Sequence, residues 1–115
     1  MMATKLEERR NFKRLKLQTP LRYQVRGTPE FNNSISEDIS TGGISFTNQS
    51  FIPKSTLVML EIGLMTRVLN PVGRVAWSQP LPHSDRYRVG VEFMELNRWE
   101  RIFLNDYINM QFNNA

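Results

Sequence analysis

The chain has 115 residues, of which 40% are hydrophobic and 23% are charged, and these values are typical of one globular domain with a single core. It contains no cysteine, which excludes disulfides, thiolate metal sites and cysteine nucleophiles. Its one histidine provides too few ligands for a zinc cluster and does not support a Ser-His-Asp triad. No apolar run approaches the roughly 20 residues of a membrane-spanning helix, and the amino end lacks a signal-peptide core. We therefore expect a cytoplasmic protein with no membrane insertion.

The formal net charge of +4 is concentrated at the amino end, where residues 1–26 hold eight basic and two acidic side chains. A local basic segment raises the concentration of anions around it, so an anionic partner is one interpretation. A solvated tail that only aids solubility is the other, and charge alone does not separate the two.

The first 18 residues show no clear periodicity, which is consistent with a short helix or with an arm that orders on binding. Arg10 and Arg14 are four positions apart and share one side of either a helix or an extended chain. A guanidinium binds phosphate oxygens, or O6 and N7 of guanine, through two hydrogen bonds. The spacing of these two arginines is by itself weak evidence of a binding site, because it often occurs by chance.

Apolar residues in alternation or in short runs predict six strands, at 21–25, 31–39, 44–47, 56–62, 68–77 and 87–93. Asn70-Pro71 interrupts the fifth of these and indicates an edge or a bulge. Val75 and Trp77 are two positions apart, so we expect them on the same face. Asp38-Ile39-Ser40-Thr41-Gly42-Gly43, taken alone, predicts a hairpin whose short polar side chains bind the local backbone.

The period changes at the carboxyl end. Asn97 with Glu100 three residues later is typical of a capping box and predicts a helix over 97–112. Apolar residues at helical spacing are expected to pack on the sheet, with partner binding as the less favoured alternative. These residues are Trp99, Ile102, Phe103, Leu104, Tyr107, Ile108, Met110 and Phe112. Six strands and then one helix favour a small antiparallel barrel.

Four motifs in order carry a resemblance to a known family. They are Arg10-x-x-x-Arg14, Asp38-x-Ser40-x-x-Gly43, Gly73-x-Val75-x-Trp77 and the run Tyr87-Arg88-Val89-Gly90-Val91-Glu92-Phe93. Together they resemble the PilZ domain, the bacterial receptor for cyclic di-GMP, from about Glu8 to Phe93. The resemblance implies an all-β fold with a C-terminal helix, namely a six-stranded antiparallel PilZ-type β-barrel. It also implies one domain over 1–115, with a basic amino-terminal arm (1–18), a barrel (19–94) and a helix (97–112).

The resemblance also implies roles for the site residues. Arg10 and Arg14 would bind the phosphate and the Hoogsteen edge of a guanine. Asp38 would accept hydrogen bonds from guanine N1 and N2, Ser40 would bind the ligand or fix the turn, and Gly43 would allow close backbone approach.

Three further residues belong to this interpretation. Arg9 directly precedes the arginine pair and would stack on the second guanine of an intercalated ligand pair. Trp77 would flank the ligand, although its pattern fits a core residue equally well. Arg88 is expected to be a surface residue.

By this resemblance the protein is a cyclic di-GMP receptor, not an enzyme, with no cofactor or metal. It would change conformation and signal to an unidentified downstream protein as a monomer or weak dimer. The alternative is a PilZ-like adaptor of flagellar or pilus machinery that binds protein and no nucleotide. A nucleic-acid-binding barrel is disfavoured because no strand combines exposed aromatic and basic residues.

Overall fold

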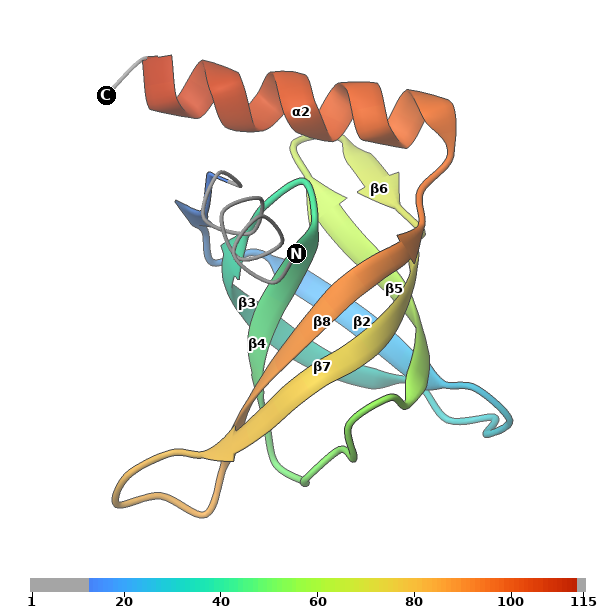
Figure 1. The fold of residues 1–115 in the computed structure, drawn as a ribbon, viewed down its shortest axis with the longest axis vertical. Coiled ribbons are helices and arrows are strands. Elements are labelled where there is room, and N and C mark those ends of the chain that lie inside the picture. Colours follow the sequence, from blue (N-terminus) through green and yellow to red (C-terminus); the bar gives the residue numbers. More distant parts are fainter. Residues whose placement is uncertain (1–12, 114–115) are drawn as a thin grey trace, which may run out of the picture.

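The computed structural model of this chain describes residues 13–113. Its elements in chain order are β1 (Leu15–Lys16), β2 (Pro20–Val25), β3 (Asn32–Ile39), β4 (Gly43–Asn48), β5 (Leu57–Leu64), β6 (Arg67–Leu69), β7 (Val72–Pro80), β8 (Tyr87–Glu95) and α2 (Arg98–Asn113). The strands form a barrel, and α2 lies across one end of it (Figure 1).

Six strands close the barrel in the order β3-β2-β5-β7-β8-β4, because β4 pairs with β3 as well as with β8. Each of these pairs is antiparallel. Two short strands are added outside this ring, β1 on β3 and β6 on β5. The predicted six-stranded antiparallel barrel with a following helix is confirmed. The strand expected at 68–77 is divided into β6 and β7, and Asn70-Pro71 separates them as its sequence indicates.

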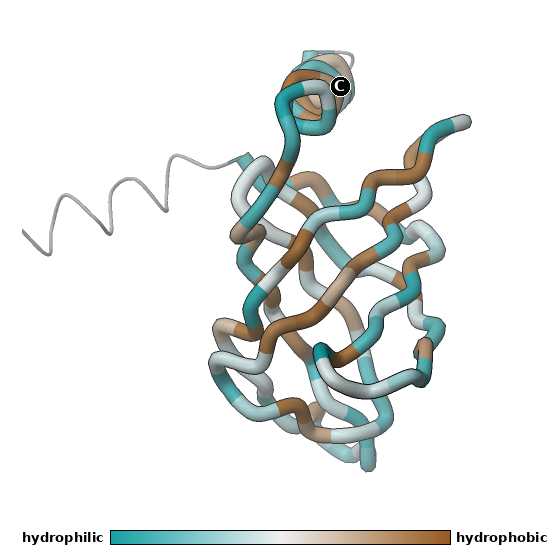
Figure 2. The backbone as a smooth tube through the Cα atoms, turned by 90° about the vertical axis from the view of Figure 1, so that its right-hand side faces the viewer, coloured by the Kyte–Doolittle hydropathy of each residue, from teal (hydrophilic) through white to brown (hydrophobic). Residues whose placement is uncertain are grey.

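One hydrophobic core fills the barrel. Hydrophobic and hydrophilic positions alternate along strands of the barrel (Figure 2). Because consecutive side chains of a strand point to opposite faces, the hydrophobic ones gather inside the barrel. The rings of Tyr23 and Phe46 are the large aromatic groups of this core, with centroids 5.3 Å apart. Helix α2 adds Leu104 and Ile108, both fully buried, and so covers the end of the barrel.

The helix begins with the predicted capping box. Asn97 Oδ1 accepts a hydrogen bond from Glu100 N at 2.9 Å, and Glu100 Oε1 accepts one from Asn97 N at 3.2 Å. The other oxygen, Glu100 Oε2, accepts a hydrogen bond from Asn70 N at 2.6 Å. The buried Glu100 carboxylate therefore caps the helix and also ties it to the connection between β6 and β7.

The apolar stripe of α2 packs on the barrel only in part. Its inward row is Glu100, Leu104 and Ile108, at spacings of four, and Phe103 and Tyr107 are partly buried beside it. The remaining apolar residues are 39–53% exposed and are Trp99, Ile102, Met110 and Phe112. The expectation that the whole stripe is core is wrong for these four, because a single straight helix buries only the stripe that faces the barrel.

Within residues 13–113, no helix is both long enough and apolar enough to cross a membrane.

Candidate functional site

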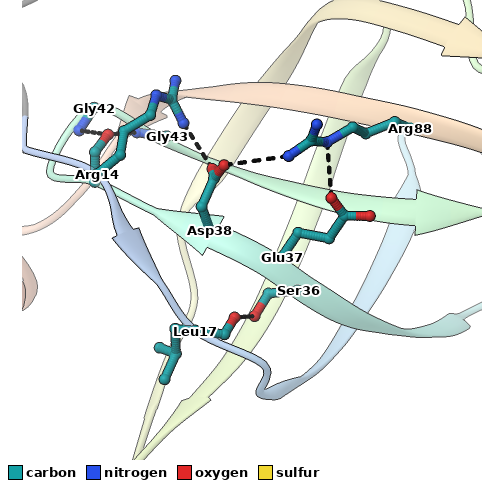
Figure 3. Close-up of polar contacts among 9 residues, drawn as sticks. Arg14, Leu17, Ser36, Glu37, Asp38, Gly42, Gly43 and Arg88 are labelled. Atoms are coloured by element: carbon teal, nitrogen blue, oxygen red, sulfur yellow. Dashed lines mark hydrogen bonds and ion pairs between the residues drawn. The ribbon is translucent and has the colours of Figure 1, made fainter.

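Asp38 and Arg14 form the charged part of the candidate site. Asp38 Oδ1 lies 2.8 Å from Arg14 Nη1, within hydrogen-bond distance (Figure 3). Strand β1 explains this proximity, because Lys16 pairs with Asp38 across the sheet and holds the residues just before it at the same place. The Asp38 side chain is 16% exposed and that of Arg14 is 53% exposed. The pair is thus accessible to an incoming anion on the arginine side.

A β-bulge sets the direction of Asp38. The β3–β4 register gains one residue between Ser36 and Asp38, so Glu37 has no partner of its own. Ser36 and Ile39 are buried in the barrel, whereas Glu37 and Asp38 are both only partly buried on its outer side. In a regular strand, consecutive side chains point to opposite faces, and the bulge allows these two carboxylates to share one.

Ser40 organises the turn that follows. Its Oγ accepts hydrogen bonds from the backbone N–H groups of Gly42 and Gly43, at 3.1 and 3.2 Å. The side chain is 1% exposed. Of the two roles that the resemblance implies for Ser40, the structure therefore shows the one in which it fixes the turn.

Gly43 is a point of close contact between strands. A Cβ on this residue would lie 2.3 Å from the carbonyl oxygen of Val91 on β8, far inside van der Waals contact. Backbone atoms cannot move away as a flexible side chain does. Glycine at this position is required by the approach of β4 to β8.

Trp77 lies on the outer face of the barrel. The register of β7 against β8 gains one residue between Val75 and Trp77, so that Val75 pairs with Val91 and Trp77 pairs with Gly90. Val75 points inward and is 1% exposed, whereas the Trp77 ring lies against the position where Gly90 would carry a Cβ, 2.2 Å from the ring atom Cε2. The expectation that Val75 and Trp77 share one face is wrong, because this bulge reverses the alternation.

These residues surround a pocket of about 160 Å³. Its lining consists of Arg14, Ser40, Gly42, Gly43, Ile44, Ala76, Trp77, Gly90, Val91 and Glu92. Four of the predicted site residues thus line one pocket, namely Arg14, Ser40, Gly43 and Trp77. Asp38 is not part of this lining but binds Arg14, which is. Arg9 and Arg10 lie outside the described residues.

Comparison with known proteins gives the family. The model of the PilZ domain matches residues 8–109, which is most of the chain. The chain belongs to the PilZ family. A search of curated proteins gave no match.

Solved structures agree with the PilZ fold. The chain is similar to Bacillus subtilis inhibitor of motility (MotI/DgrA), with a TM-score of 0.81, 19% identity and coverage of 91% of this chain and 52% of that chain. It is also similar to the PilZ domain of Escherichia coli YcgR with cyclic di-GMP, with a TM-score of 0.71, 12% identity and coverage of 93% and 94%. The K. pneumoniae MrkH complex with cyclic di-GMP is similar with a TM-score of 0.71, 15% identity and coverage of 91% of this chain and 53% of that chain. The PilZ chain thus spans about half the length of MotI/DgrA and MrkH.

Two residues near the PilZ pocket were missed by the sequence analysis. Arg88 was expected at the surface, where its side chain is 41% exposed, but its contacts were not predicted: its guanidinium lies 2.8 Å from Glu37 and 3.6 Å from Asp38 (Figure 3). Gly90 forms the surface on which Trp77 lies. Arg88 and Gly90 alternate along β8 with the core residues Val89 and Val91, so the sequence pattern places both on the outer face. This pattern would have indicated both residues if Trp77 had been known to lie on the same face.

A larger hollow, of about 690 Å³, lies elsewhere in the PilZ barrel, where β3 and β4 separate beyond Ser36 and Phe46. Neutral side chains such as Asn32, Asn33 and Gln49 line much of it, and none of the predicted site residues does. The smaller pocket is the better candidate for an anionic, planar ligand, because its wall combines the Arg14 guanidinium, which binds Asp38, with the Trp77 ring and the Ser40 turn.

Proposed function

We propose that this PilZ protein is a cytoplasmic receptor for cyclic di-GMP that acts by binding rather than catalysis. The observation that carries the proposal is the Arg14–Asp38 pair beside a pocket formed by the Ser40 turn and Trp77. The YcgR and MrkH structures contain cyclic di-GMP, and their folds are similar to this one.

The chemistry of the pocket matches a guanine on a phosphodiester. Asp38 offers two acceptor oxygens to the N1–H and N2–H groups of the base, and Arg14 offers a planar fork to phosphate or to the Hoogsteen edge. The pocket of about 160 Å³ has room for one planar base beside the Trp77 indole, with the remainder of the ligand outside it. Charge-assisted hydrogen bonds contribute about 1.5–3 kcal/mol each, so three or four yield micromolar affinity after ordering costs.

The two arginines that precede Arg14 complete the proposal. Arg10 acts together with Arg14 on the phosphate and the guanine edge. Arg9 stacks on the second guanine of a ligand pair and offsets its charge, which corresponds to two nucleotides for each chain.

Binding has to rearrange the pair that this structure contains. Arg14 and Asp38 bind each other at 2.8 Å, whereas the ligand requires the guanidinium for its anionic groups and the carboxylate for its base. Strand β1 directly follows Arg14, is only two residues long and pairs with β3. A movement of Arg14 therefore also displaces the rest of the basic arm (1–18). The basic arm closes over the barrel, and the new surface binds a downstream protein.

Isothermal titration calorimetry with cyclic di-GMP tests the proposal, with GTP and cyclic di-AMP as control ligands. We expect micromolar binding of cyclic di-GMP, loss of binding in Arg14→Ala and Asp38→Ala, and two ligands per chain that fall to one in Arg9→Ala. Arg22→Ala is the matched control, because Arg22 is 47% exposed and pairs with Glu61 away from the pocket. A folded wild type that releases no heat with cyclic di-GMP would contradict the proposal.

A second candidate is an adaptor that binds only protein. The observation that favours it is the exposure of Trp99, Ile102 and Met110 on α2, at 44–53%. In that case Arg14→Ala leaves partner binding unchanged, and cyclic di-GMP has no effect on it.

A further inference from the structure

Arg88 bridges two consecutive carboxylates on β3, which lies two strands away from its own strand. It belongs to β8 and pairs with Thr47 of β4, and its side chain extends across β4 to reach β3 (Figure 3). Its Nε lies 2.8 Å from Glu37 Oε2, and its Nη2 lies 3.6 Å from Asp38 Oδ2. The bulge at Glu37 makes this bridge possible, because it turns both carboxylates to the outer face of the barrel.

Glu37 anchors the bridge. Its second oxygen, Oε1, accepts a hydrogen bond from Thr47 Oγ1 at 2.5 Å, so the carboxylate is held from β4 as well. Arg88 Nε is buried and has no hydrogen-bond partner within residues 13–113, which means that its approach to Glu37 is an ion pair without hydrogen-bond alignment. Charge therefore sets the position of the guanidinium, and Glu37 and Thr47 fix where that charge lies.

The contact with Asp38 is too long for a hydrogen bond, which normally spans about 2.7–3.2 Å. Arg88 thus attracts Asp38 Oδ2 without occupying its lone pairs. Arg14, in contrast, occupies Oδ1 at 2.8 Å and has to leave when a ligand takes both oxygens. Arg88 lies outside the lining of the 160 Å³ pocket and lines another hollow with Lys16 and Asp38. It approaches Asp38 at Oδ2, whereas Arg14, which lines the pocket, binds Oδ1.

We propose that Arg88 is a positioning residue that keeps the Asp38 carboxylate oriented toward a guanine edge after Arg14 has moved to the ligand. The inference rests on the proposed function of the pocket. It assigns selectivity for the guanine 2-amino group to the Glu37–Arg88–Asp38 bridge, because two hydrogen bonds to one base require both oxygens to stay in the plane of that base.

The test compares cyclic di-GMP with cyclic di-IMP, whose hypoxanthine bases lack the 2-amino group. Calorimetry on the full chain measures both dissociation constants and their ratio. In the wild type we expect cyclic di-IMP to bind roughly tenfold more weakly, since one Asp38 oxygen loses its donor. In Arg88→Gln we expect cyclic di-GMP to bind roughly three- to tenfold more weakly and the ratio to fall toward one. Arg88→Lys keeps a charge but cannot bridge two carboxylates, so we expect its ratio of dissociation constants to lie between those of the wild type and Arg88→Gln.

Arg22→Gln is the matched control, with similar exposure and a partner carboxylate on the adjacent strand, and its ratio should equal that of the wild type. An unchanged ratio in Arg88→Gln would overturn the inference, whether both affinities stay at the wild-type level or fall by the same factor, because general attraction of anions predicts equal losses. If Arg88→Gln does not fold, the ratio in Arg88→Lys decides in the same way. A wild type that binds neither nucleotide contradicts the proposed function itself, whereas a wild type that binds with an Arg88-independent ratio contradicts only this inference.

Discussion

The indole of Trp77 lies directly on Gly90 of the adjacent strand, and a Cβ on Gly90 would be 2.2 Å from the ring atom Cε2. The bulge on β7 turns the ring to the outer face, and the missing side chain of Gly90 leaves the space that it occupies. One wall of the candidate pocket therefore depends on two residues that belong to different motifs of the sequence.

Gly90→Ala should displace the Trp77 ring. We expect the barrel to fold with a free energy of unfolding lower by about 1–3 kcal/mol, the cost of overpacking, and nucleotide binding to weaken. Urea unfolding and calorimetry measure the two effects. Gly63→Ala is the control, because a Cβ on Gly63 would meet only the Pro20 carbonyl oxygen, at 3.7 Å. Equal effects of both substitutions would show that Trp77 does not occupy this place.

The face on which Trp77 lies was not predictable from the sequence. Alternation placed Val75 and Trp77 on one face, although it did predict that both belong to a strand, which is β7. A bulge has no reliable signal in a single sequence, because it depends on the register of two strands that are distant along the chain. The bulge at Glu37 on β3 is a second case, and it is what allows Glu37 and Asp38 to share a face.

Ser40→Ala should destabilise the turn. The change leaves the N–H groups of Gly42 and Gly43 without their acceptor, and we expect a loss of about 1–3 kcal/mol in the free energy of unfolding. Ser45→Ala is a close control, since Ser45 is equally buried at 1% but its Oγ has no hydrogen-bond partner in the described part of the chain. Urea unfolding should show little change, or a gain in stability, for Ser45→Ala. A control as costly as Ser40→Ala would argue against the turn as the cause.

Glu100→Gln should cost nearly as much stability as Glu100→Ala. Each carboxylate oxygen of Glu100 accepts a backbone N–H, from Asn97 and from Asn70, and a glutamine amide replaces one acceptor by a donor. We expect each variant to lose about 1–3 kcal/mol in urea unfolding. Glu30→Gln, at an exposed position between β2 and β3, should be neutral. Wild-type stability in Glu100→Gln would mean that the second hydrogen bond is unimportant.

Tyr23 should make stability fall at high pH. Burial raises the pKa of its hydroxyl above the ordinary value of about 10, and the hydrogen bond to Asn48 opposes this rise only in part. The folded state therefore holds the proton more tightly than the unfolded state. This contribution to stability is complete below pH 10 and is lost as the pH rises from there through the raised pKa. Urea unfolding between pH 8 and 11 should show a smaller decline in Tyr23→Phe than in the wild type, and parallel curves would contradict the assignment.

The predictions that succeeded from sequence depended on local signals. Asn97 and Glu100 are three residues apart, and their capping box was predictable because both partners lie in one helical turn. Arg88 was missed because its partners lie on β3, two strands away across β4. The exposed aromatic ring of Trp99 was missed for a similar reason, since the width of the barrel end decides how much of α2 is covered.

Amide and indole NMR of the labelled protein tests directly whether cyclic di-GMP binds in the Trp77 pocket. Addition of cyclic di-GMP should shift the indole N–H of Trp77 and the amides of Ser40, Gly42 and Gly43, while the indole N–H of Trp99 on α2 serves as the internal control. Shifts that are confined to the β3–β4 hollow around Asn32 and Gln49, or no shifts at all with a folded protein, would contradict the account.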